Sequence, residues 1–216
     1  MRIIKPGDFD DHRVKALLDE PTASRRPLTE DEIRAAHVAE VTPLNGRVVI
    51  VEYDPQWAEL FEREAARIRG VLAERALRIE HVGSTSVPGL PAKPVIDIVL
   101  VVADSADETA YVTVLAAAGY RLHVREGYWY EHRMFKGPDT DINLHTFSAG
   151  CPEIDRMLVF RDWLRATPTD RQLYARTKLD LAQRDWTFIQ NYADAKSAVI
   201  SSIMTRVRLD GSRIAQ

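Results

Sequence analysis

The stretch from Glu80 to Val102 combines a short strand, a turn of small residues and a longer apolar strand. The turn contains glycine, serine and threonine and is followed by three prolines, so we do not expect it to be helical. The second strand is a run of valine, isoleucine and leucine that carries one carboxylate, Asp97. Such a run is typical of a strand buried in a sheet, where an unpaired charge would cost several kcal/mol. The stretch therefore predicts a sheet protein in which Asp97 is paired, metal-bound or protonated.

The turn before this strand is rich in hydrogen-bond donors. Its backbone N–H groups and hydroxyl groups are of the kind that proteins use to hold phosphate oxygens. A glycine here could equally serve the turn alone. Because the donors are denser than a turn needs, we expect phosphate binding at Gly83, Ser84, Thr85 and Ser86.

Composition limits the class of protein. The chain has 216 residues, of which 45% are hydrophobic and 28% charged, so it can bury a sizeable core. We expect an arm or linker over 1–28, one domain over 29–208 and a tail over 209–216. A net charge of −3 argues against a nucleic-acid or membrane partner. One cysteine, Cys151, excludes an internal disulfide, and no segment resembles a signal peptide or membrane span, so we expect a soluble cytoplasmic protein.

Local patterns predict an α+β fold with a helical C-terminal segment. Residues 29–32 form a capping box, and Asp54 with Pro55 begins a helix whose buried face repeats every three or four residues through Leu72. Glycine-containing turns separate three strands in the middle of the chain. Helices are expected over 10–18, 30–38, 54–72, 105–118, 153–166, 169–184 and 187–207, and strands over 47–53, 80–82, 95–102, 120–125, 128–136 and 140–147.

Three polar residues alternate with apolar ones in the last predicted strand. Asp141, Asn143 and His145 should therefore share one face of the strand. Such alternation usually means exposure to solvent. If the strand lies next to Asp97, however, His145 and Asn143 could complete a metal shell, and Asp141 could supply a second carboxylate. Our expected metal ligands are Asp97, His145 and Asp141.

Other candidate residues have a structural interpretation and a functional one. His81 could be a core histidine or a general acid or base. Lys93 could be a solvated loop lysine or a group that stabilises charge. Arg133 could lie on an exposed basic face or neutralise a triphosphate. We take Asp97, His81 and Lys93 as catalytic candidates and Arg133 as a phosphate-binding candidate.

Two tyrosine–lysine pairs occur in the predicted C-terminal helices. Tyr174 and Lys178, and likewise Tyr192 and Lys196, are four residues apart and so share a helix face. A tyrosine can stack on a base while the ammonium group meets a phosphate. An amphipathic pair can equally lie along apolar surface with its charge in water. The functional interpretation assigns Tyr174, Lys178 and Lys196 to nucleotide binding.

The spacing of the turn and the carboxylate resembles that of nucleotidyltransferases. Val82, Gly83 and Ser84 are followed, after twelve residues, by Asp97 and an apolar residue. In that superfamily a second carboxylate comes two positions after the first, and this chain has Val99 there. Residues i and i+2 of a strand face the same way, so the usual carboxylate pair of a two-metal site is missing.

Several longer motifs are similar to those of the GrpB family. They are the run from His81 to Leu90, the run from Lys93 to Ile98, the segments 43–53 and 161–165, and the two tyrosine–lysine spacings. The resemblance covers roughly residues 28 to 205. It implies a nucleotidyltransferase-like fold, mostly unassigned activity and occasional fusion to dephospho-CoA kinase.

Two functions are consistent with these observations. The first is an enzyme that uses ATP and Mg²⁺ to transfer an adenylyl group to, or to ligate, a small molecule or protein acceptor. Lys93, Arg133 and Lys196 would then stabilise charge on the transferring phosphoryl group. The second is a non-catalytic nucleotide- or coenzyme-binding accessory module that lost turnover with the second carboxylate.

Overall fold

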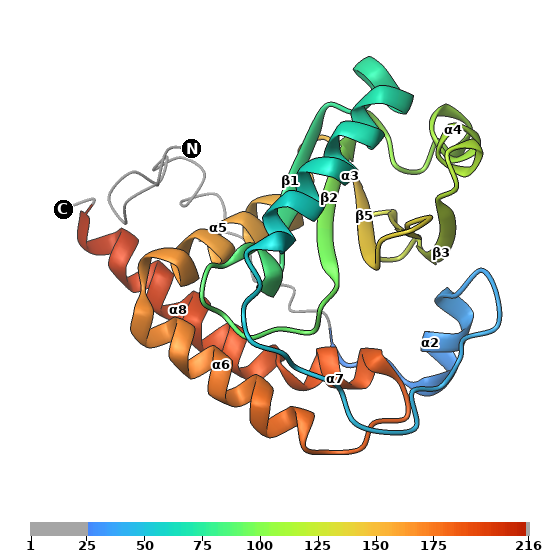
Figure 1. Ribbon diagram of the computed structural model, residues 1–216. Coiled ribbons are helices and arrows are strands. Elements are labelled where there is room, and N and C mark those ends of the chain that lie inside the picture. Colours follow the sequence, from blue (N-terminus) through green and yellow to red (C-terminus); the bar gives the residue numbers. More distant parts are fainter. Residues whose placement is uncertain (1–25, 215–216) are drawn as a thin grey trace. The chain divides into compact units, whose positions relative to one another are not determined.

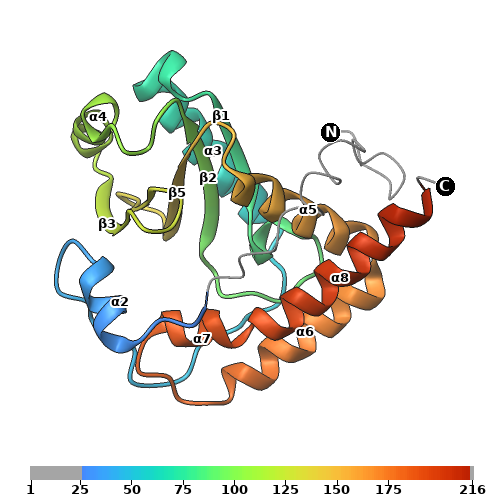
Figure 2. The same ribbon diagram turned by 180° about the vertical axis from the view of Figure 1, so that it is seen from behind.

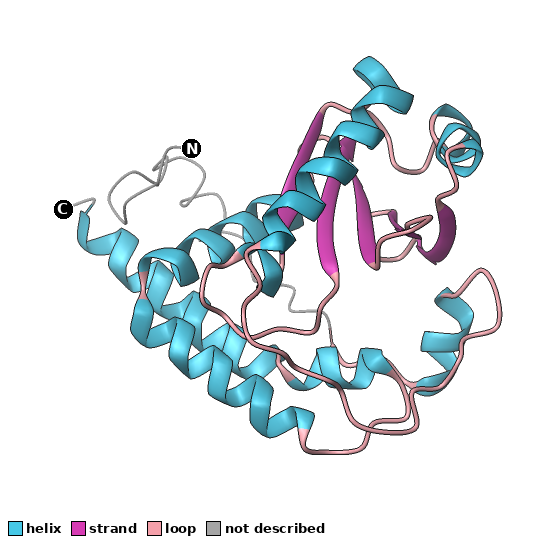
Figure 3. Ribbon diagram, in the orientation of Figure 1, coloured by secondary structure: helices cyan, strands magenta, loops and turns pink. Residues whose placement is uncertain are grey.

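The computed structural model describes residues 26–214, with side chains through residue 210, so the helix predicted over 10–18 lies outside the described residues. The fold is α+β (Figures 1 and 3). Its helices are α2 (Glu30–Ala36), α3 (Gln56–Leu72), α4 (Val112–Ala117), α5 (Pro152–Ala166), α6 (Pro168–Ala182), α7 (Ile189–Ala195) and α8 (Ser197–Ile214). Its strands are β1 (Arg78–Val82), β2 (Ile96–Val102), β3 (Arg121–Glu126), β4 (His132–Lys136) and β5 (Ile142–Ser148).

The five strands form one mixed sheet in the order β1-β2-β5-β4-β3. β2 pairs in parallel with β5, and the other neighbouring strands pair antiparallel. β2 is buried along most of its length, which explains its continuous run of valine, isoleucine and leucine. The register places Asp97 opposite Val82 of β1 on one side and Asn143 of β5 on the other. The predicted α+β fold with helices flanking a sheet is confirmed.

Helix α3 packs against one face of this sheet (Figure 1), and in the view from behind it lies beyond the strands (Figure 2). Its apolar side chains recur every three or four residues and so form one stripe. The stripe enters the main core together with alternate residues of β2 and β5 and with residues of α4. The predicted buried face is confirmed, and it consists of Trp57, Phe61, Ala65, Ile68 and Leu72.

The chain forms two compact units. One contains residues 29–41 and 51–154, and thus the whole sheet with α2, α3 and α4. The other combines residues 42–50 with the C-terminal segment from Asp155 onward. Within this helical unit, Gly46 pairs with Trp186 through two backbone hydrogen bonds. None of the helices in the described part of the chain has the length and apolar character that crossing a bilayer requires.

Some predicted elements differ from the observed ones. Residues 47–53 form no strand: Gly46 and Val51 each make an isolated bridge, and the Val49 side chain is 68% exposed. The helix predicted over 105–118 divides into a short 3₁₀ helix, Glu108–Ala110, and α4. Ser84–Ser86 also form one 3₁₀ turn where no helix was expected.

Two further boundaries have a backbone cause. β4 begins at His132, later than predicted, because Tyr130 and Glu131 have positive φ and belong to the hairpin turn. The helix predicted over 187–207 is two helices, α7 and α8, with Lys196 between them.

Candidate functional site

Asp97 lies on the face of the sheet opposite the α3 core, beside two side chains of β5. Asn143 donates a hydrogen bond from Nδ2 to Asp97 Oδ1 over 2.8 Å. His145 Nε2 lies 3.7 Å from the same oxygen, and the two side chains are 21% and 30% exposed. The parallel pairing of β2 and β5 therefore brings together residues that the sequence separates widely. The predicted proximity of Asp97 to Asn143 and His145 is confirmed.

The surroundings of Asp97 favour its ionised form. Burial alone would raise the pKa of the carboxyl group. The imidazole of His145, the amide of Asn143 and the ammonium group of Lys93 outweigh burial and lower this pKa to about 2. Asp97 is thus a carboxylate at neutral pH, and half-buried Lys93 is close enough to act on it electrostatically.

The glycine turn lies against this carboxylate. Gly83 has φ +68°, and a β-carbon there would overlap Asp97 Oδ2 and come within 2.9 Å of Asp97 Cγ. Only a residue without a side chain fits, because L residues rarely adopt this φ and the carboxylate already occupies the space. Ser84 follows as a half-buried residue. The structure thus places the Gly83 backbone in direct contact with the Asp97 carboxylate.

The other two residues of the turn bond to the protein itself. The Thr85 hydroxyl donates to the carbonyl oxygen of Val95 over 3.3 Å, and the Ser86 hydroxyl donates to that of Gly83 over 2.6 Å. Both residues are buried. Of the four predicted phosphate-binding residues, Thr85 and Ser86 therefore use their hydroxyl groups to stabilise the turn. Gly83 and Ser84 lie closer to the surface, beside Asp97.

His81 faces the opposite side of the sheet. Its ring stacks on Phe61 of α3, with centroids 4.8 Å apart, and its Nε2 lies 3.1 Å from the Thr85 hydroxyl oxygen. Since side chains alternate along a strand, His81 points into the core while Val82 shares the face of Asp97. The structure does not bring His81 to the predicted site.

Asp141 lies near the start of β5 and pairs with a lysine. Lys136 donates to Asn143 Oδ1 over 2.8 Å and to Asp141 Oδ1 over 3.3 Å. Asp141 is thus oriented toward Lys136, and the Asp141 side chain is 62% exposed. Throughout residues 26–214, no three or more His, Cys, Asp or Glu side chains form a group that could hold a metal ion. Of the three expected ligands, only Asp97 and His145 come together.

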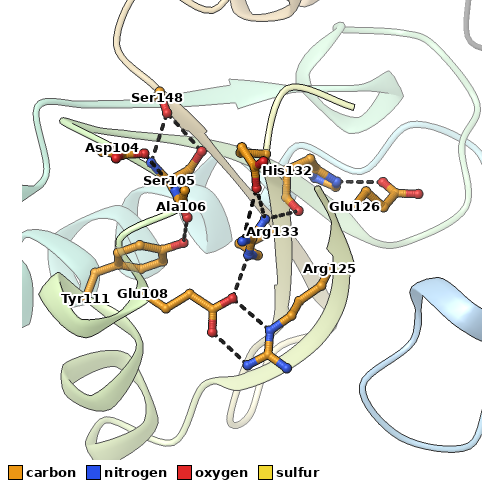
Figure 4. A network of polar contacts seen from close by, with 11 residues as sticks. Asp104, Ser105, Ala106, Glu108, Tyr111, Arg125, Glu126, His132, Arg133 and Ser148 are labelled. Carbon is orange, nitrogen blue, oxygen red and sulfur yellow. Dashed lines mark hydrogen bonds and ion pairs between the residues drawn. The ribbon is translucent and has the colours of Figure 1, made fainter. Parts of the chain in front are cut away.

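Arg133 takes part in an ion-pair network on the other face (Figure 4). It pairs in register with Thr146, whose side chain points away from that of His145. Its Nε donates to Glu108 over 2.7 Å, and Arg125 donates to the same carboxylate over 2.7 Å. Hydrogen bonding to Arg125 is the main reason why the pKa of Glu108 is lowered; Arg133 adds to it. This placement separates Arg133 from Asp97 and gives it a structural role.

A chain of polar contacts continues from His145 to the buried residues His132 and Glu126, and sequence reasoning missed it. His132 Nε2 lies 3.0 Å from His145 Nδ1, and His132 Nδ1 lies 2.8 Å from Glu126 Oε2. Figure 4 shows the contact between His132 and Glu126. The three residues come from three adjacent strands, so only the sheet register reveals the chain. The available sequence signal was the two-residue spacing of His132, Met134 and Lys136, which places them on one face of β4.

The tyrosine–lysine pairs form contacts within the helical unit. Lys178 Nζ lies 5.0 Å from the ring centroid of Tyr174, and Lys196 Nζ lies 4.8 Å from that of Tyr192. Both are cation–π contacts. The predicted sharing of a helix face is confirmed for Tyr174 and Lys178 in α6, whereas Lys196 follows the last residue of α7. Lys178 is 2% exposed, which is unusual for a lysine.

Comparisons with known proteins agree on one family. The model of the GrpB protein family matches residues 47–206 of this chain. The UPF0157 protein of Halalkalibacterium halodurans is 59% identical over 185 residues, which cover 86% of this chain and 95% of that protein. The UPF0157 protein of Streptomyces coelicolor is 44% identical over 155 residues, which cover 72% of this chain and 81% of that protein.

Two other similarities concern the fold and a larger protein. The crystal structure of the conserved protein GrpB from Enterococcus faecalis matches with a TM-score of 0.65 and 33% identity, covering 74% of this chain and 98% of that one. A dephospho-CoA kinase of Mycobacterium bovis is 33% identical over 175 residues. That match covers 68% of this chain but only 42% of the kinase.

Proposed function

We propose that this chain, which belongs to the GrpB family, is a nucleotidyltransferase-like enzyme that acts on a nucleotide, ATP in the first instance. The activity of that family is mostly unassigned. The enzyme would work in the cytoplasm and activate or modify a small molecule or a protein. The observation that carries the proposal is the contact of the Gly83 turn with the ionised carboxylate of Asp97. It unites a donor-rich turn and a single charged carboxylate in the spacing that resembles nucleotidyltransferases.

The turn would bind the phosphates of the nucleotide. Gly83 lets a ligand approach the backbone closely, and Ser84 adds a hydroxyl group beside it. The ammonium group of Lys93 adds positive charge near Asp97, where a phosphate would otherwise be repelled by the carboxylate.

Asp97 would hold the Mg²⁺ ion that accompanies the nucleotide. Mg²⁺ is commonly bound through one or two carboxylates together with substrate phosphates, so a single carboxylate fits this role. Asp141, in contrast, pairs with Lys136, so Asp97 is the carboxylate proposed to bind Mg²⁺ beside the Gly83 turn. A bound Mg²⁺ would neutralise phosphate charge. The protein's part would be to orient the phosphates through Gly83 and Ser84 and to stabilise their charge through Lys93.

The acceptor would receive the adenylyl group of ATP, and pyrophosphate would leave. In the ligase variant, an acceptor carboxylate activated in this way would pass to an amine with release of AMP. Tyr174, Lys178 and Lys196 are proposed as an anion-binding element of the helical unit, in which partly buried Lys196 would contact the anion and the buried pair of Tyr174 and Lys178 would lie behind it. Arg133 is not part of this proposal, because Glu108 already neutralises it on the other face of the sheet.

Calorimetric titration with a non-hydrolysable ATP analogue, with and without Mg²⁺, tests the proposal. We expect binding that requires Mg²⁺ and is weakened at least about tenfold, or about 1.4 kcal/mol, by Asp97→Asn. Asp180→Asn is the matched control, because this carboxylate is exposed on α6 and should leave the affinity unchanged. Failure of the wild-type chain to bind the analogue under both conditions would refute the proposed function.

A non-catalytic accessory module is the second candidate. Two observations favour it: Val99 stands where a second carboxylate would be, and the chain is similar to part of a mycobacterial dephospho-CoA kinase. This function predicts binding of a nucleotide or of dephospho-CoA that needs no metal and survives Asp97→Asn. It also predicts that prolonged incubation with ATP and Mg²⁺ yields no pyrophosphate.

A further inference from the structure

Two hydrogen bonds connect Lys136 of β4, through Asn143 of β5, to Asp97 of β2. Lys136 Nζ donates to Asn143 Oδ1 over 2.8 Å, and Asn143 Nδ2 donates to Asp97 Oδ1 over 2.8 Å. The three strands are neighbours in the sheet. Because Phe135 of β4 lies opposite Leu144 of β5, Lys136 and Asn143 come side by side directly beyond that pair. The register thus links a lysine two strands away to the site carboxylate.

The chemistry at both ends fixes the orientation of the Asn143 amide. A lysine ammonium group only donates hydrogen bonds, and a carboxylate only accepts them. The amide must therefore turn its oxygen to Lys136 and its nitrogen to Asp97. Turning it over would place two donors together at one end and two acceptors at the other. Asn143 is partly exposed, yet its amide is held from both sides.

Lys136 is itself held against β5. Besides Asn143, its ammonium group donates to Asp141 Oδ1 over 3.3 Å, and the Lys136 side chain is 27% exposed. Two of its three N–H groups thus bind acceptors of the protein. These two contacts direct Lys136 toward the residues at the start of β5.

The two oxygens of Asp97 have different surroundings. Oδ1 accepts the hydrogen bond from Asn143 and lies 3.7 Å from His145 Nε2. Oδ2 faces Gly83, where a β-carbon would overlap it. In the part of the chain that the structure describes, Oδ2 accepts no hydrogen bond. It is therefore the oxygen available to a ligand beside the Gly83 turn.

We propose that Lys136 and Asn143 are positioning residues that hold Asp97 Oδ1 on the sheet and so turn Oδ2 toward the Gly83 turn. There Oδ2 would bind the Mg²⁺ that accompanies the nucleotide, so the inference rests on the proposed function. The terminal torsion of an aspartate is broad, and without the Asn143 amide the carboxylate would rotate. Lys136 acts through Asn143 and contacts neither the metal ion nor the nucleotide.

A double-mutant cycle tests whether Lys136 acts through Asn143. The quantity measured is the calorimetric affinity of the full chain for the non-hydrolysable ATP analogue with Mg²⁺. Asn143→Ala should weaken binding about tenfold, and Lys136→Met about three- to tenfold. In the Asn143→Ala background, Lys136→Met should cause no further loss, because the amide through which it acts is gone.

Arg121→Met is the matched control. Arg121 lies opposite Lys136 in register on β3, and its side chain is exposed. The substitution removes the same charge from a neighbouring position, so the affinity should stay unchanged. Equal losses in Arg121→Met and Lys136→Met would overturn the inference in favour of a general charge effect. A further loss from Lys136→Met in the Asn143→Ala background would also overturn it, because Lys136 would then act on the ligand directly.

Nitrogen-15 NMR of the Asn143 side-chain amide tests the same tether without nucleotide or metal. The signal is identified by its disappearance in Asn143→Ala. We expect slow exchange of its hydrogen-bonded proton with water in the wild-type chain and in Arg121→Met, and several-fold faster exchange in Lys136→Met. Wild-type exchange as fast as that of Lys136→Met would overturn the inference.

The NMR measurement also separates the two ways of failing. A slowly exchanging amide in a chain that does not bind the ATP analogue would confirm the tether but refute the proposed function, and with it the role of Oδ2. A rapidly exchanging amide in a chain that binds the analogue would refute the tether alone.

Discussion

Gly83 and Asp97 occupy adjoining positions so closely that a β-carbon on Gly83 would overlap the Asp97 carboxylate. The first residue belongs to the turn after β1 and the second to β2, which pairs antiparallel with β1. The position of the carboxylate thus depends on the absence of a side chain on the turn. This dependence can be measured.

Gly83→Ala should destabilise the protein more than Gly89→Ala. Both glycines have positive φ, +68° and +75°, so alanine at either position is strained by about 1–3 kcal/mol. Only position 83 adds overlap with Asp97, whereas a β-carbon at position 89 would meet nothing within 4 Å. Overpacking of this kind adds about 1–3 kcal/mol. Urea unfolding of the two variants gives the difference, and equal losses would contradict the close approach.

Asp97 should contribute to stability at neutral pH and lose this contribution in acid. Its pKa is lowered from 3.8 to about 2, so the folded state binds its proton less readily than the unfolded chain. The contribution, about 2 kcal/mol, is present above the unfolded pKa and disappears as the pH falls through the folded pKa.

Urea unfolding of the wild-type chain and of Asp97→Asn, between pH about 5 and about 2, measures this contribution. Other carboxylates titrate in the same range, so the informative quantity is the difference between the two proteins. That difference should shrink as the pH falls. A difference that stays constant would show that Asp97 is not stabilised in its ionised form.

Tyr192→Phe should leave the stability unchanged or raise it. Tyr192 is 4% exposed, and among the described residues nothing hydrogen-bonds its hydroxyl oxygen. Burial, with a contribution from Tyr174, raises the pKa of Tyr192, so the buried group is a neutral phenol. An unsatisfied buried hydroxyl costs about 1–3 kcal/mol, which phenylalanine would avoid.

The same variant tests whether the hydroxyl serves a ligand. If the tyrosine–lysine pairs bind an anion, Tyr192→Phe and Lys196→Met should both weaken binding of the ATP analogue while the fold remains intact. A clear loss of stability in Tyr192→Phe would mean instead that the hydroxyl has a structural partner. Thermal unfolding and calorimetry on the same samples separate these outcomes.

Arg133→Met should reduce stability without changing the affinity for the ATP analogue. Arg133 is 7% exposed and donates to Glu108, and hydrogen bonds to charged groups contribute about 1.5–3 kcal/mol. Arg125→Met is the matched control, because Arg125 binds the same carboxylate from a side chain that is 49% exposed. Arg125→Met should lower the free energy of unfolding by less than Arg133→Met does. A selective loss of nucleotide affinity in Arg133→Met would restore the phosphate-binding role that the sequence suggested.

Patterns that depend on near neighbours predicted the structure well. The capping box between Thr29 and Glu32 is present, because its two hydrogen bonds need only one helical turn. The buried stripe of α3 follows from helical periodicity alone. Residues 47–53, in contrast, have strand-forming side chains but no strand, because a strand also requires a continuous partner and only Val51 pairs with Ala92.

The candidate site was predictable where one strand determined it. Asp141, Asn143 and His145 share a face because of strand alternation, and Asp97 was conspicuous in an apolar run. The position of His81 on the opposite face, and the chain of polar contacts from His145 to Glu126, depend on sheet register. Register is a relation between distant segments, which the local sequence does not specify.

The pairing of Gly46 with Trp186 has a consequence for how the chain must be made. Val48 is 5% exposed and packs with Leu181, Ala182 and Tyr192, which are translated more than a hundred residues later. During synthesis the Val48 side chain therefore stays exposed to solvent until the C-terminal helices have emerged from the ribosome. A fragment that stops after the sheet would retain residues 42–50 but lack the helices that bury Val48. A single cut of the chain therefore does not remove the whole helical unit.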